Sequence, residues 1–101
     1  MTGTRRTSDG LSHRRKRLLF RSWHRGIREM DLVLGQFADA HIGYLSDGEL
    51  DLYEALLEAP DPEVFKWITE AAPVPANFDT PILERIRRFH VEVPEHLGIR
   101  P

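Results

Sequence analysis

Apolar residues recur at intervals of three and four positions through much of this sequence, which is the spacing of helices that bury one face. The clearest stripe follows Gly26 and predicts a second helix: Ile27, Met30, Leu34, Phe37, Ala38 and His41. Upstream, Leu11, Leu19 and Trp23 share the stripe of a first helix. That helix would begin at Ser8 or Ser12 and end near Trp23. Gly26 interrupts the pattern, so we expect the turn between the two helices there.

Capping and proline signals divide the rest of the chain into three more helices. Ser46 and Glu49 have the spacing of a capping box, in which each side chain accepts a backbone N–H at the start of a helix. Asp61-Pro62 and Thr80-Pro81 each pair a capping residue with a proline at the first helical position. Pro73-Val74-Pro75 prevents the fourth helix from continuing.

Apolar positions inside these three helices would complete a single core. They are Leu50, Tyr53, Leu56 and Leu57, then Val64, Phe65, Ile68 and Ala72, and finally Ile82, Ile86 and Phe89. We find no strand, although Val91-Glu92-Val93-Pro94 alternates and would form a short extended tail. The fold class predicted is all-α, a compact five-helix bundle with short proline and glycine turns and frayed termini. A flexible basic leader would span 1–10, one helical domain 11–91 and a flexible tail 92–101.

Composition narrows the possible functions. The chain has 101 residues, of which 41% are hydrophobic and 30% charged, as in one small globular domain. It contains no cysteine, which excludes disulfides and thiolate chemistry, and its five histidines lack the spacing of a metal site. There is no Gly-x-Ser-x-Gly elbow, no phosphate-binding glycine loop and no apolar run of about 20 residues. We therefore expect no catalytic residue, metal, bound cofactor or membrane insertion, and a protein that acts by binding.

Charge is unevenly distributed, although the formal net charge is only −2. Nine of the 14 Lys and Arg residues lie at or before Arg28. From Glu29 to Asp79 there are twelve acidic residues and a single basic one. We expect a strongly dipolar molecule, whose field would orient an approaching partner.

The basic first segment offers an alternative function. His13-Arg14-Arg15-Lys16-Arg17, followed by Phe20 and Trp23, could lie along a nucleic-acid backbone. Against this, no recognition helix is evident, and the acidic remainder would repel a polyanion. A basic-helix nucleic-acid-binding protein is therefore the alternative interpretation, and a helical adaptor is a third.

The segment Arg25-Gly26-Ile27-Arg28-Glu29 joins the basic and acidic parts of the chain. If it is helical, Arg25 and Glu29 lie one turn apart and share a face. Gly26 has no side chain, so a partner's backbone could approach closely beside this pair. In the other interpretation, Gly26 is the left-handed residue that ends a helix, and Arg25 and Glu29 form a solvated ion pair. The sequence alone leaves both open.

Three segments together resemble a known family. They are Trp23-His24-Arg25-Gly26-Ile27-Arg28-Glu29-Met30-Asp31, Leu45-Ser46-Asp47-Gly48-Glu49 and Asp61-Pro62-Glu63-Val64-Phe65-Lys66-Trp67-Ile68. In this order they resemble the succinate dehydrogenase assembly factor family, with the likeness running from about Leu18 to about His90. Its members are small five-helix proteins that promote covalent attachment of FAD to the flavoprotein subunit of the dehydrogenase.

The resemblance implies an assembly factor or chaperone rather than an enzyme, with that flavoprotein subunit as its partner. Arg25, Gly26 and Glu29 match the family's Arg-Gly-x-x-Glu motif, so they are expected to meet the flavoprotein near its flavin-linking histidine. Arg25 and Glu29 would make polar contacts, and Gly26 would permit close approach. Arg28 would steer the encounter or contact the rim.

Aromatic residues would complete the predicted partner-binding set. Phe20 or Trp23 would supply an anchor if either is exposed. The chain departs from the family at His24, where relatives commonly carry a second arginine. A second family motif matches four residues that we expect to be structural, in a capped helix that braces the second helix: Asp61, Pro62, Phe65 and Trp67.

The resemblance leaves several properties open, among them direct binding of free FAD and service to fumarate reductase as well. We expect a monomer that binds no nucleic acid. A bacterial cytoplasm is favoured over the mitochondrial matrix as its location.

Overall fold

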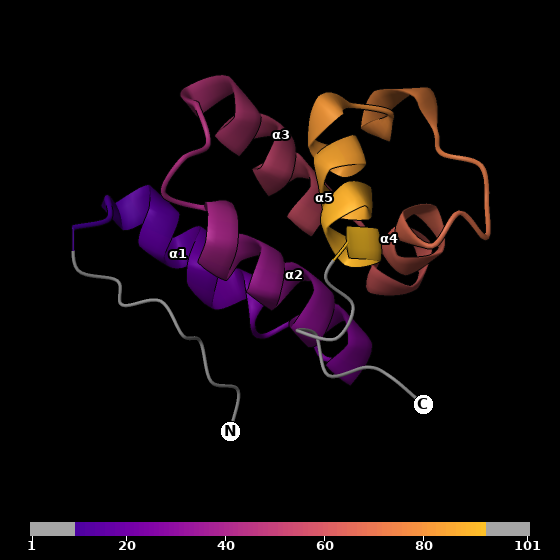
Figure 1. The fold of residues 1–101 in the computed structure, drawn as a ribbon, viewed down its shortest axis with the longest axis horizontal. Helices are drawn as coiled ribbons and strands as arrows, with labels where there is room; N and C mark the ends of the chain where they lie inside the picture. Colours follow the sequence, from indigo (N-terminus) through magenta and orange to yellow (C-terminus); the bar gives the residue numbers. More distant parts are fainter. Residues whose placement is uncertain (1–9, 93–101) are drawn as a thin grey trace.

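The computed structural model describes residues 10–92 of the chain, which form helices and the turns between them (Figure 1). The elements in order are α1 (His13–Ser22), α2 (Arg28–His41), α3 (Asp47–Leu57), α4 (Asp61–Ile68), the 3-10 helix η1 (Ala76–Phe78) and α5 (Pro81–Glu92). Over these residues the predicted all-α fold with five α-helices is confirmed. The predicted leader and tail lie almost wholly outside the described residues, so their boundaries stay predictions.

The helices pack around α2 and α5. Figure 1 shows α1 and α2 side by side and running in opposite directions, with α5 against α2, α3 and α4. The α1 helix also contacts α3. Between α4 and α5, Phe78 of η1 stacks on Trp67 with ring centroids 5.0 Å apart, so the proline-rich connection is held against α4.

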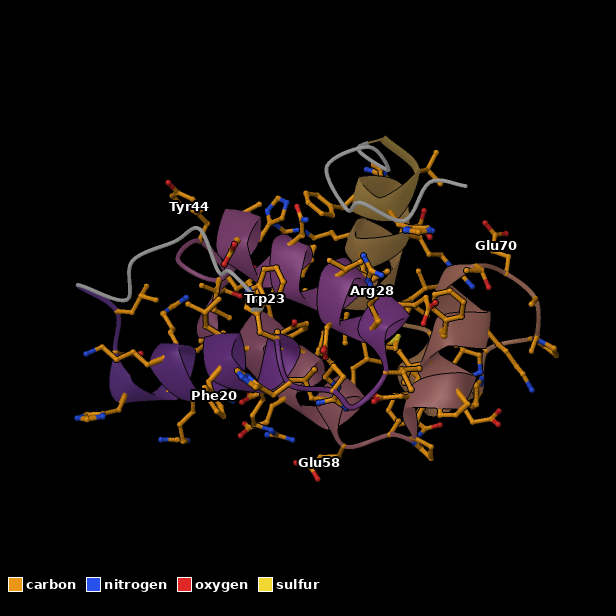
Figure 2. The ribbon with its side chains drawn as sticks, turned by 90° about the horizontal axis from the view of Figure 1, so that it is seen from below. Phe20, Trp23, Arg28, Tyr44, Glu58 and Glu70 are labelled. Carbon is orange, nitrogen blue, oxygen red and sulfur yellow. The ribbon has the colours of Figure 1, made fainter. Side chains whose placement is uncertain are left out.

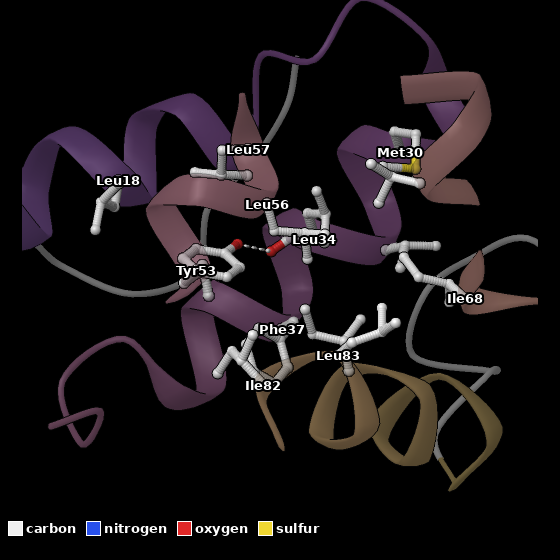
Figure 3. Packing of buried hydrophobic residues seen from close by; sticks show 14 of the residues in the cluster. Leu18, Met30, Leu34, Phe37, Tyr53, Leu56, Leu57, Ile68, Ile82 and Leu83 are labelled. Carbon is white, nitrogen blue, oxygen red and sulfur yellow. Dashed lines mark hydrogen bonds between the residues drawn. The ribbon is translucent and has the colours of Figure 1, made fainter. Parts of the chain in front are cut away.

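The core is continuous across all five helices. Its largest fully buried side chains include Phe37, Met30, Leu18, Ile82 and Tyr53 (Figure 3). The Tyr53 hydroxyl lies 2.6 Å from the Ser22 hydroxyl and donates to the Leu34 carbonyl at 3.4 Å. Burial raises the pKa of Tyr53, which keeps it neutral. The hydrogen bonds matter because an unpaired hydroxyl in this core would be strongly unfavourable.

Local capping signals are confirmed at three helix starts. Ser12 caps α1 by accepting the Arg15 N–H at 3.2 Å. At α3 both bonds of the capping box form between Ser46 and Glu49, at 2.8 and 3.1 Å. Thr80 caps α5 by accepting the Leu83 N–H at 3.4 Å. The signals at Ser46 and Thr80 predicted their helix starts within a residue, because they depend only on neighbouring side chains. For α1, the structure selects Ser12 over Ser8, the other predicted start.

Four sequence expectations about these elements are wrong. The fourth helix was expected to include Ala72, but α4 ends at Ile68. Asp61 does not cap α4: Pro60 is the N-cap residue, and the Asp61 carboxylate accepts hydrogen bonds from Arg25 instead. Ile27 does not lie on the buried stripe, because it precedes α2 as the N-cap residue and is 40% exposed. Val91-Glu92 continue α5 rather than forming an extended tail, since the next proline in the sequence is Pro94.

Candidate functional site

The connector between α1 and α2 begins at Trp23, the residue after the last turn of α1. The backbone N–H groups of Trp23 and His24 donate to carbonyls of the last turn of α1, at 3.1 and 3.3 Å. Gly26 follows with φ of +105°, a backbone conformation that other residues rarely adopt. A Cβ placed at Gly26 would meet nothing within 4 Å. Gly26 therefore lies three residues past the C-cap Trp23 and turns the chain after α1 has already ended. It also leaves open space beside the chain, as the docking interpretation requires.

The segment from Arg25 to Glu29 is not one helix, because α2 begins only at Arg28. The shared helical face of Arg25 and Glu29, which required a helix there, is therefore absent. The Arg25 guanidinium turns inward. Its Nε and Nη2 donate to Asp61 Oδ1 at 3.0 and 2.8 Å, and Nη2 also donates to the Leu57 carbonyl at 2.8 Å. Only 10% of the Arg25 side chain and 12% of the Asp61 side chain are exposed. Arg25 thus joins the connector to the end of α3 and the start of α4.

A second bond fixes the connector to α2. The backbone N–H of Arg25 donates to Asp31 Oδ1 at 2.5 Å. Asp31 lies in the first turn of α2, where a carboxylate also interacts favourably with the helix dipole. The main chain and the side chain of Arg25 are therefore both held by other elements of the fold.

Past Arg25 the chain turns outward. Gly26, Ile27, Arg28 and Glu29 are all exposed. On α1, Phe20 is 62% exposed and the His24 ring stacks on it, with centroids 3.9 Å apart and planes 20° apart. His24 Nδ1 donates to the Phe20 carbonyl at 2.7 Å, which holds the stacked geometry. Figure 2 shows Phe20 on α1 and Arg28 at the start of α2. We name six residues the connector surface: Phe20, His24, Gly26, Ile27, Arg28 and Glu29.

Trp23 is a core residue. It is 5% exposed, and its indole Nε1 donates to Asp39 Oδ1 at 3.2 Å. Its ring lies against Gly35 of α2, where a Cβ would overlap the indole atoms. The anchor role predicted for Phe20 or Trp23 required an exposed ring, and of these two only Phe20 meets that condition. The role of Gly35 was not predicted from the sequence, although a lone glycine inside the strongest helical stripe is a signal of close packing.

The basic face of α1 lies against acidic side chains of α3. Arg14 pairs with Asp51 and Glu54 at 2.6 and 2.9 Å, and Arg21 pairs with Glu58 at 2.8 Å. Charges that are far apart in the sequence are therefore adjacent in space at these positions. Of the basic run that the nucleic-acid interpretation would place on phosphates, Arg14 is already ion-paired within the chain.

Residues 10–92 hold no group of three or more side chains placed to bind a metal ion. Within this same range, none of the helices has the length and apolarity that crossing a bilayer requires. A shallow hollow lined by His41, Arg85, Arg88 and Phe89 has a volume of about 160 Å³. Small-molecule sites commonly enclose roughly 300–1,000 Å³, so this hollow is small for one. The connector surface is thus the stronger candidate site.

Comparison with known proteins supplies the family. The sequence model of the family described as "Flavinator of succinate dehydrogenase" matches residues 16–90. The chain belongs to this family. The resemblance seen in the sequence is thereby confirmed, and the match contains both the connector surface and the Arg25–Asp61 pair.

Three relatives illustrate the similarity. The chain is 44% identical over 73 residues to "Succinate dehydrogenase assembly factor 2, mitochondrial" of Dictyostelium discoideum, covering 72% of this chain and 52% of the relative. It is 41% identical over 78 residues to "FAD assembly factor SdhE" of Acetobacter pasteurianus, covering 77% of this chain and 72% of that relative. "Succinate dehydrogenase assembly factor 2, mitochondrial" of Meyerozyma guilliermondii is 36% identical over 88 residues, covering 83% of this chain and 65% of that relative. The chain thus spans only about half the length of the Dictyostelium protein.

These relatives come from both bacterial and mitochondrial settings. The preference for a bacterial cytoplasm therefore stays a prediction.

Proposed function

We propose that this chain is an assembly factor of succinate dehydrogenase that binds the flavoprotein subunit and promotes covalent attachment of FAD to one of its histidines. Membership of the flavinator family supports the proposal, as do relatives named for dehydrogenase assembly and for FAD assembly. The factor acts by binding and is not itself an enzyme.

The observation that carries the proposal is the open backbone at Gly26. A partner can approach this glycine without meeting a side chain, because nothing lies within 4 Å of where a Cβ would be. Arg28 and Glu29 stand exposed beside it with opposite charges, and the exposed Phe20 ring offers an apolar contact. Such a patch combines close approach, directional polar contacts and an aromatic anchor, which are properties of protein-binding surfaces.

The chemistry in this proposal belongs to the flavoprotein. The new bond joins the partner's histidine nitrogen to the 8-methyl carbon of FAD, and one methyl C–H bond and the imidazole N–H bond break. The two electrons of the C–H bond stay on the flavin ring, which is left reduced and takes up the two protons released. This chain contributes orientation: it holds a flavoprotein conformation in which the histidine and the methyl group are aligned.

The test is to produce the flavoprotein subunit with and without this chain and to measure flavin fluorescence of the denatured subunit. Only covalently attached flavin survives denaturation. We expect strong fluorescence with the chain and weak fluorescence without it. Equal fluorescence in both preparations would refute the proposed function.

A further inference from the structure

Two segments that lie 36 residues apart meet at one nearly buried ion pair, Arg25 with Asp61. Arg25 belongs to the connector, and Asp61 is the first residue of α4. The carboxylate receives two N–H groups of the guanidinium, at 3.0 and 2.8 Å. Both N–H groups converge on the same oxygen, Oδ1, and these charge-assisted hydrogen bonds leave the Arg25 side chain little freedom.

The same guanidinium also closes the end of α3. Its Nη2 donates to the Leu57 carbonyl, one of the last carbonyls of that helix, which has no partner further along the helix. Together with the bond from the Arg25 backbone N–H to Asp31, this links the connector to α2, α3 and α4. Within residues 10–92, no other residue of the connector is hydrogen-bonded to three other helices, as Arg25 is through its backbone N–H and its guanidinium.

The residue that needs this support is the next one. Glycine has more backbone freedom than any other residue. Gly26 touches nothing where a side chain would stand, so packing around it cannot hold its φ of +105°. Its conformation must therefore be imposed by its neighbours. Ile27 is held on one side as the N-cap residue of α2, and Arg25 is held on the other by its bonds to α2, α3 and α4.

We infer that Arg25 and Asp61 are positioning residues, which order the connector so that Gly26, Ile27 and Arg28 are presented to the flavoprotein. Asp61 itself is nearly buried and stands outside the connector surface. This inference rests on the proposed function, because it assumes that the chain binds the flavoprotein. Asp61 would affect that binding indirectly, by fixing the conformation of the connector.

The test uses Asp61→Asn and Asp61→Ala in the full chain, with Glu58→Gln as the matched control. Asparagine keeps the shape and one acceptor oxygen but removes the charge, so it serves if the alanine variant does not fold. Glu58 pairs with Arg21 between α1 and the end of α3, but that pair is exposed and does not touch the connector. Two quantities are measured: ¹⁵N order parameters of the free chain, and its affinity for the purified flavoprotein subunit.

In the Asp61 variants we expect order parameters at Gly26 and Ile27 to fall from roughly 0.8 to below about 0.6, while those at Val33 and Ile86 stay unchanged. Affinity should fall at least about tenfold. Glu58→Gln should change neither quantity. If Asp61 contributed only to overall stability, the order parameters would fall evenly along the chain or stay unchanged. Those of Gly26 and Ile27 would then fall no more than the others.

Unchanged order at Gly26 and Ile27 in a folded Asp61 variant would overturn the inference while leaving the proposed function intact. Lower order with unchanged affinity would overturn it as well. If the wild-type chain fails to bind the flavoprotein, the proposed function falls and the inference falls with it.

Discussion

The indole ring of Trp23 occupies the space that a side chain at position 35 would fill. Trp23 follows the last turn of α1, and Gly35 lies in the middle of α2. A Cβ at Gly35 would overlap three ring carbons of the indole. The close approach of α1 to α2 therefore depends on this glycine, and the connector surface is built where these two helices join.

Replacing Gly35 with alanine should destabilise the protein. Alanine favours the helix by about 1 kcal/mol, but the indole cannot move without disturbing the core around it. We expect a net loss of about 1–3 kcal/mol in the free energy of unfolding, measured by urea denaturation. Gly48→Ala is the matched control, because Gly48 is also helical and its Cβ would come no closer than 4.0 Å to Ser46 Oγ. That variant should be neutral or more stable. Equal stability of the two variants would contradict the packing described here.

Within residues 10–92, Glu70 is the non-glycine residue that has a positive φ, +61°. It follows the C-cap residue of α4, and the next N–H, from Ala71, donates back to the Lys66 carbonyl at 2.7 Å. This is a Schellman ending, in which glycine is the usual residue at the left-handed position. Glu70→Gly should therefore raise the free energy of unfolding by about 0.5–1 kcal/mol, since the left-handed strain outweighs the added freedom of the unfolded chain.

Glu70→Ala is the control for that prediction. It removes the same carboxylate but keeps the strained backbone, so thermal unfolding should show no comparable gain. A gain of similar size in both variants would mean that the charge, and not the backbone, is responsible.

His41 should make stability depend on pH near neutrality. Burial, and next the nearby Arg85 guanidinium, lower the pKa of His41 below its ordinary 6.5. Arg85 Nη2 donates to His41 Nδ1 at 3.3 Å, which requires that nitrogen to be unprotonated. The unfolded chain therefore binds a proton more readily than the folded one. Stability from this group is fully present above pH 6.5 and is lost as pH falls through 6.5 toward the lowered value.

The measurement is the urea midpoint between pH 7.5 and 5.5, for the wild type and His41→Gln. The wild-type midpoint should fall across this range, and the variant should fall less. His90 also has its pKa lowered by burial, so some dependence should remain in the variant. Identical profiles for the two proteins would contradict the role given to His41.

Local signals predicted much of the fold. The Ser46–Glu49 capping box and the Thr80-Pro81 signal each act within one turn, so their helices begin as expected. The stripe after Gly26 correctly predicted burial of Met30, Leu34 and Phe37, because helical periodicity depends on the chain's own geometry.

The contacts of the site could not be predicted in this way. The partner of Arg25 lies 36 residues away, and the sequence offers many carboxylates at such distances. Asp61 has the features of a capping residue, so local signals predict that its carboxylate bonds to the α4 backbone. In the folded chain α4 packs beside the connector, and the carboxylate accepts from Arg25 instead. The same tertiary context turned Arg25 inward and left Ile27 exposed.

Docking of the flavoprotein at Gly26 is tested most directly by Gly26→Arg. Gly10 provides a matched control, because it too has a positive φ, +84°, and open space around it. Arginine at either position meets strain from a positive φ, of about 1–2 kcal/mol. Only at position 26 would the new side chain stand on the connector surface, since Gly10 lies before the other end of α1. Gly26→Ala adds the strain without the bulk.

The measurement is covalent flavin fluorescence of the denatured flavoprotein subunit, produced together with each variant. We expect the wild type and Gly10→Arg to give full labelling and Gly26→Arg to give no more than the background without the factor. Its helix content by circular dichroism should remain nearly that of the wild type. Full labelling with a folded Gly26→Arg chain would contradict the claim that the flavoprotein docks at this glycine.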